Sequence, residues 1–245
     1  MFSAEDRQQL RDELVSVARA DARISAAALL GSSALGREDR WSDIDIALCL
    51  ACDADRTLAT ADWTDRMYSE HAAVHHMDVT HGETLYRVFL LSSTLQVDVS
   101  FWAQAQFGAI GPNFRLLFGT ANPLAAAAPS PVELVGMGWL YALHARSSIA
   151  RGRGWQAEYM ISAMRDQVLA LACLRHGVPA VQGRGMDDLP PEATVAVAPG
   201  LVRSPDIPEL KRAFAAITQA LLAEIDRTDS GLANRLTKPL RELAS

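Results

Sequence analysis

One arrangement limits the possible folds of this chain more than any other: a short apolar segment that ends in a glycine turn, followed by alternating acids. Residues 25–30 are mostly apolar and stop at Gly31, and residues 43–48 begin with alternating acidic and apolar side chains. We interpret the first segment as a buried strand, although its alanines leave a helix open, and the second as a strand. Side chains at positions i and i+2 of a strand share a face, so Asp43 and Asp45 are expected to project together.

The rest of the first half indicates further helices and strands. Ser3 is a hydroxyl N-cap followed by early acids, which predicts a helix that runs to about Ala20. The hydrophobic pattern also predicts a helix at 55–71, a strand at 74–79 and a hairpin of strands at 86–91 and 95–101.

Prolines mark a change in composition between Asn122 and Pro131, where they surround an alanine run. We place a domain boundary there, which gives domains at 1–125 and 126–245. Beyond it the sequence predicts helices at 132–150, 156–176, 207–226 and 232–243, with a loop rich in Gly and Pro at 177–205. The expected fold is α/β (α+β), with a mixed, largely antiparallel sheet flanked by helices, followed by an all-helical C-terminal domain.

Charge is unevenly distributed along the 245 residues, whose formal net charge is −6. Residues 1–130 hold 17 Asp and Glu but only 10 Lys and Arg. An acidic surface is a poor partner for a long nucleic acid, but it suits divalent cations and the phosphates that they carry. The chain has no apolar run of membrane-spanning length, no secretory leader pattern and only three cysteines. We therefore expect a cytoplasmic protein with no membrane contact.

A third acid, Asp98, lies between two valines in the second strand of the predicted hairpin. If that strand lies beside the strand of Asp43 and Asp45, three carboxylates converge on one point. Hard oxygen ligands in that number suit Mg²⁺, and two such ions form a known clamp for nucleotidyl transfer.

The glycine turn has a different purpose. Gly31 lets the backbone approach a ligand closely, and Ser32 and Ser33 can offer donors to phosphate oxygens. A P-loop would need Lys and then Ser or Thr after a second glycine, whereas Arg37 and Glu38 follow Gly36 here. No dinucleotide-binding glycine pattern follows a strand, which argues against a nicotinamide enzyme.

One combination of motifs in this sequence resembles the nucleotidyltransferase superfamily. It consists of a strand followed by Gly31-Ser32, a short helix, the segment Ser42-Asp43-Ile44-Asp45 and the distant Asp98. Within the superfamily, the length of the chain and its helical second half look most like the small antibiotic nucleotidyltransferases, which act on aminoglycosides or lincosamides. The motif match covers about residues 27–101, and the second half resembles that group only in being helical.

The resemblance implies a nucleotidyltransferase-type sheet and a reaction that moves AMP from ATP to a hydroxyl of a small molecule. Asp43, Asp45 and Asp98 would bind Mg²⁺, with two ions expected, and Asp98 could instead be the base that takes the proton of the hydroxyl. Residues expected to hold the nucleotide or to support its site are Gly31, Ser32, Ser33 and Ser42. Ser33 could equally cap the short helix.

Glu158 is a second candidate for the general base. Some antibiotic nucleotidyltransferases take their base from a glutamate in the helical domain, and Glu158 lies near the start of a predicted helix there. A glutamate early in a helix is also favoured by the helix dipole alone, so the match is one of position.

Three functions are compatible with the sequence. A small hydroxyl-bearing acceptor is the leading one, and the acidic first half favours a cationic aminoglycoside without deciding against a lincosamide. The acceptor could instead be a protein partner, as in antitoxin-like nucleotidyltransferases. The chain could also be a nucleotide-binding module without catalysis. The sequence does not indicate an oligomeric state.

Overall fold

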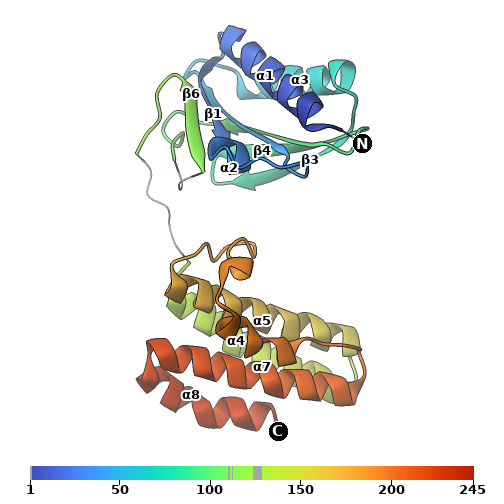
Figure 1. The fold of residues 1–245 in the computed structure, drawn as a ribbon, viewed down its shortest axis with the longest axis vertical. Coiled ribbons are helices and arrows are strands. Elements are labelled where there is room, and N and C mark those ends of the chain that lie inside the picture. The colour runs from blue at the N-terminus through green and yellow to red at the C-terminus, as the bar shows by residue number, and fades with distance from the viewer. Residues whose placement is uncertain (1, 110, 112, 124–128) are drawn as a thin grey trace. The chain divides into compact units, whose positions relative to one another are not determined.

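The computed structural model describes residues 2–109, 111, 113–123 and 129–245. The chain separates into two compact units, Met1–Ala127 and Ala128–Ser245 (Figure 1). The domain boundary predicted between residues 125 and 126 lies outside the described residues.

The first unit is built on a six-stranded sheet with the order β3-β4-β5-β2-β1-β6. Its strands are β1 (Ile24–Leu30), β2 (Ile44–Leu50), β3 (Ala73–His81), β4 (Thr84–Leu91), β5 (Gln96–Trp102) and β6 (Phe114–Phe118). β2 and β5 pair in parallel, and the other neighbouring strands pair antiparallel. This confirms the predicted mixed, largely antiparallel sheet.

The edge strand β6 was not predicted from the sequence. Its five residues are all half-buried or exposed, so they lack the alternation of buried and exposed positions that indicates a strand. It is a strand because it pairs with β1, a contact between segments far apart in the chain.

Two helices, α1 (Ala4–Ala20) and α3 (Arg56–Glu70), cover one face of the sheet (Figure 1). The side chains on that face form the larger core of the unit, in which Leu14, Trp63 and Met67 of the helices pack against alternate residues of the strands. Ser3 caps α1 as predicted, because its hydroxyl accepts a hydrogen bond from the amide of Asp6.

The second unit is helical. Its main helices are α4 (Pro131–Ala150), α5 (Gly154–His176), α7 (Ile207–Thr228) and α8 (Ser230–Leu243), in good agreement with the predicted ranges. No helix of the described residues is both long and apolar enough to cross a membrane. The fold class is therefore the predicted one: a mixed sheet flanked by helices, then a helical unit.

The predicted loop at 177–205 is more structured than expected. It contains the short helix α6 (Pro191–Val195) and two 3₁₀ turns, Met186–Asp188 and Ala198–Gly200. The prediction was wrong here because prolines were interpreted only as breakers, whereas a proline in the first turn of a helix starts it without losing a hydrogen bond.

Candidate functional site

Three acids are neighbours where β2 lies beside β5. Asp45 of β2 is directly opposite Asp98 of β5 in the register of the parallel pair. Asp43 immediately precedes β2, and its Oδ2 accepts a hydrogen bond of 3.2 Å from Nε2 of Gln96, the first residue of β5. All three acids are half-buried.

The alternation of the two strands fixes the face to which these acids point. Ile44 and Ile46 of β2 are buried in the core beneath α1 and α3, as are Val97 and Val99 of β5. Residues between them in each strand must therefore project from the opposite face. The isoleucines and valines thus place Asp45 and its neighbour across the pair on the face that the two helices leave uncovered.

Burial and mutual repulsion act together on Asp98. Burial, together with the negative charges of Asp45 and Asp43, raises the pKa of its carboxyl to about 7. Its Oδ1 is buried and has no hydrogen-bond partner among the described residues. A buried oxygen without a partner, beside two further carboxylates, is the environment that a bound cation would relieve.

The turn after β1 lies against the same acids. Gly31 begins the short helix α2 (Gly31–Ala34) with φ of +61°, a left-handed conformation that side chains rarely adopt. A Cβ built on Gly31 would overlap Oδ2 of Asp45. Glycine is therefore required here on two grounds, and it brings the backbone of the turn next to the Asp45 carboxylate.

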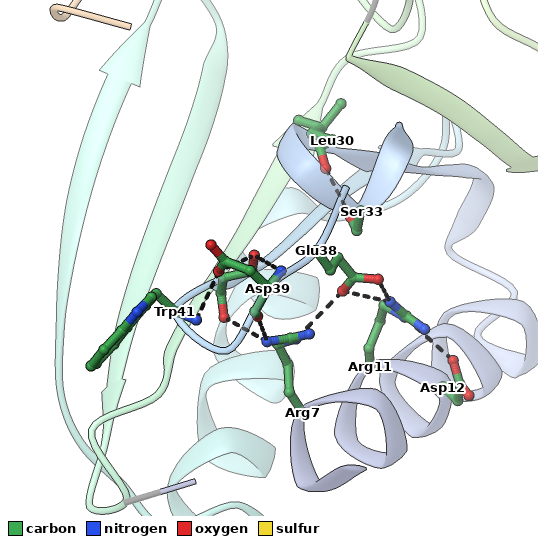
Figure 2. A network of polar contacts seen from close by, with 9 residues as sticks. Arg7, Arg11, Asp12, Leu30, Ser33, Glu38, Asp39 and Trp41 are labelled. Atoms are coloured by element: carbon green, nitrogen blue, oxygen red, sulfur yellow. Dashed lines mark hydrogen bonds and ion pairs between the residues drawn. The ribbon is translucent and has the colours of Figure 1, made fainter. Parts of the chain in front are cut away.

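The two serines of the turn differ in their surroundings. Ser33 is buried, and its hydroxyl donates a hydrogen bond of 2.8 Å to the carbonyl of Leu30 (Figure 2). It is not the N-cap of α2, because that position is Leu30. Its hydroxyl thus stabilises the turn. Ser32 is half-buried, and its carbonyl accepts the amides of Leu35 and Arg37.

Ser42 stabilises the loop that enters β2. Its hydroxyl accepts a hydrogen bond of 2.9 Å from the amide of Asp39 and donates one of 3.2 Å to Oδ1 of Asp39. This closed pair of contacts holds the chain immediately before Asp43.

Glu158 belongs to the second unit, where it lies in the second turn of α5. It is half-buried, and Oε1 accepts a hydrogen bond of 2.7 Å from the hydroxyl of Ser162, one turn further along the helix. Its part in a site with the three acids stays a prediction.

Two residues at this site were not identified from the sequence. Gln96 shares the face of Asp98 because the two are separated by one residue in β5, so strand alternation alone could have placed it there. Arg7 of α1 contacts the loop before β2, and nothing in the sequence pattern links residues so far apart.

No protein-family model matches the chain, and no curated protein matches its sequence. Among solved structures, the chain is similar to an aminoglycoside 6-adenyltransferase from Bacillus subtilis, with a TM-score of 0.39 and 11% identity. The likeness covers 97% of this chain and 98% of that one. A TM-score this low carries no weight for function.

Proposed function

We propose that this protein is a metal-dependent nucleotidyltransferase that moves AMP from ATP to a hydroxyl of a small molecule. The observation that carries the proposal is the geometry of the acids. Asp45 and Asp98 are opposite each other on adjacent parallel strands, Asp43 enters the same strand pair, and the Gly31 turn lies against Asp45. This combination supplies oxygen ligands for a divalent cation next to a turn through which a phosphate chain can approach the backbone.

The donor set fits Mg²⁺. Three neighbouring carboxylates favour a hard divalent cation, and the buried Oδ1 of Asp98 has no hydrogen-bond partner among the described residues. Asp43, Asp45 and Asp98 would hold the metal, which would supply positive charge for the phosphate oxygens of the nucleotide.

The residues of this chain divide the remaining work. Transfer forms a bond between the acceptor oxygen and the α-phosphorus and breaks the bond from that phosphorus to the departing pyrophosphate. The proton of the hydroxyl needs an acceptor, which we assign to Asp98 or Glu158. Gly31 and Ser32 would hold the triphosphate. Ser33 supports the Gly31 turn, and Ser42 supports the loop before Asp43.

We assign the acceptor to small cationic molecules that carry hydroxyl groups, such as aminoglycosides or lincosamides. The excess of acids in residues 1–130 supports this assignment, because a negative surface attracts a polycation.

Pyrophosphate release tests the proposal. The wild-type protein is incubated with ATP, Mg²⁺ and a panel of aminoglycosides, lincosamides and simple amino sugars, beside the double variant Asp43→Asn/Asp45→Asn. Asp53→Asn is the matched control, since Asp53 lies in an exposed turn after β2. We expect release with at least one acceptor, retained in the control and lost in the double variant. If no compound of the panel causes pyrophosphate release while ATP still binds, the result would contradict a small-molecule acceptor and favour a protein acceptor or a non-catalytic role.

A further inference from the structure

A buried arginine of α1 holds the loop that delivers Asp43 to the site. Arg7 is 5% exposed, which is unusual for a charged residue. A guanidinium in such a place needs partners for its donors, because burying an unpaired charge is costly. The identity of its partners therefore indicates what the residue does.

The partners of Arg7 belong to the segment that connects α2 to β2. Its Nη1 donates hydrogen bonds to the carbonyls of Asp39, at 2.5 Å, and Ser42, at 3.3 Å. Its Nε lies 3.4 Å from Oε1 of Glu38, close enough for an ion pair, although the geometry is not that of a hydrogen bond. Arg7 thus contacts both ends of residues 38–42, which we name the entry loop (Figure 2).

The entry loop is folded around these contacts. Oδ1 of Asp39 accepts hydrogen bonds from the amide of Trp41, at 2.8 Å, and from the hydroxyl of Ser42. These bonds close the loop on itself but do not attach it to the rest of the unit. Arg7 and Arg11 of α1 make that attachment, as Figure 2 shows.

The point of attachment is next to a predicted metal ligand. The carbonyl of Ser42 that Arg7 binds belongs to the peptide group whose nitrogen is that of Asp43. A displacement of this peptide group changes the position of the Asp43 carboxylate directly. Asp45, by contrast, lies within β2 and is fixed by the pairing of β2 with β5 and β1.

We infer that Arg7 is a positioning residue, which sets the place of Asp43 by binding the carbonyls of Asp39 and Ser42. The inference rests on the proposed function, since it concerns the metal ligands of that site. Loss of these contacts should act on metal affinity and turnover and not only on stability, because partners behind a metal ligand typically account for 10–100-fold in either.

Arg11 provides a matched control. It lies one turn further along the same helix, and its Nη1 donates to both oxygens of Glu38, at 2.7 and 2.6 Å. Among the described residues its other partner is the adjacent Asp12, and it donates to neither of the two carbonyls that Arg7 binds. Removing Arg11 therefore removes an ion pair to the same loop while leaving Asp43 held by Arg7.

The experiment compares Arg7→Met, Arg7→Lys and Arg11→Met with the wild type. Mn²⁺ affinity is measured by the loss of the EPR signal of free Mn²⁺. Pyrophosphate release gives kcat and the Mg²⁺ concentration for half activity. Circular dichroism gives the unfolding temperature. All titrations are made well below the lowest unfolding temperature. For Arg7→Met we expect roughly 10–100-fold weaker Mn²⁺ binding and a matching fall in kcat.

A lysine at position 7 can donate to the carbonyls, but its single ammonium cannot at the same time place a second nitrogen beside Glu38, as Nε of Arg7 does. Arg7→Lys should therefore fall between Arg7→Met and wild type, by roughly 3–10-fold in Mn²⁺ affinity. Arg11→Met should bind Mn²⁺ and turn over as wild type does, even if its unfolding temperature falls. If Arg7→Met does not fold, the comparison of Arg7→Lys with Arg11→Met decides.

If both Arg7 variants keep the Mn²⁺ affinity and kcat of the wild type, whatever their unfolding temperatures, the arginine is only structural. That result would overturn the inference. An equal loss of metal affinity in Arg11→Met would overturn it too. A wild-type protein that binds Mn²⁺ but releases no pyrophosphate would instead contradict the proposed function, and the Mn²⁺ affinities would still test Arg7.

Discussion

Asp98→Asn should stabilise the metal-free protein at neutral and alkaline pH. The asparagine keeps the shape of the side chain but removes the charge that burial and the neighbouring acids oppose. The pKa of Asp98 is raised from 3.8 to about 7, so between about pH 4 and pH 7 the folded protein holds a proton that the unfolded chain has lost. The free energy of unfolding of the wild type therefore falls as the pH rises through this range and is level above it.

The size of the effect follows from the same shift. A change from 3.8 to about 7 corresponds to about 4 kcal/mol at 1.4 kcal/mol per pKa unit. This is a ceiling, because water or a small movement of Asp45 can relieve part of the repulsion. We expect Asp98→Asn to gain about 2–4 kcal/mol at pH 8, about 1–1.5 kcal/mol at pH 5, and almost nothing below pH 4.

Hydrogen exchange measured by mass spectrometry in EDTA isolates the effect in the first unit. The most protected amides of β2 and β5 report its opening, and peptides of α5 and α7 in the second unit are an internal reference. Asp53→Asn controls for the loss of an exposed negative charge. Equal protection of wild type and Asp98→Asn at pH 8, or a gain that does not shrink toward pH 4, would refute the reasoning.

Two further substitutions probe the turn and the candidate base. Gly31→Ala should abolish pyrophosphate release and lower the unfolding temperature, because a side chain is strained at a φ of +61° and the new Cβ would overlap the carboxylate of Asp45. A fully active variant would mean that the turn is not close to the acids. Glu158→Gln should retain ATP binding by calorimetry and lose turnover if Glu158 takes the proton. Unchanged turnover would leave Asp98 as the candidate base.

The side-chain pattern of single strands made the sheet and the acids predictable. Asp43 and Asp45 were placed on one face by alternation alone, and Ile44 and Ile46 do lie in the core on the other side. The position of Asp98 depended on which strands pair. The hairpin of β4 and β5 was predictable from its short connection. The parallel pairing of β5 with β2 could only be assumed as the condition under which Asp98 joins the other two acids.

Contacts between distant segments were not predictable from the sequence. β6 has no alternation and exists through its pairing with β1, and Arg7 is separated from the entry loop by the whole of β1. An arginine in the first turns of a helix is an ordinary surface residue by its sequence pattern. Its burial and its two carbonyl partners become visible only when α1 is packed against the sheet.

In the proposed function, the three acids would hold the metal at the site where the acceptor oxygen displaces pyrophosphate, so ATP is cleaved between its α- and β-phosphates. Parallel reactions with α-labelled and γ-labelled ATP, an acceptor mixture and Mg²⁺ test it directly. We predict that the α-label enters a new acceptor product, that the γ-label leaves as pyrophosphate, and that Asp43→Asn/Asp45→Asn does neither. Transfer of the γ-label to the acceptor, or the same α-labelled product with the double variant, would contradict the claim.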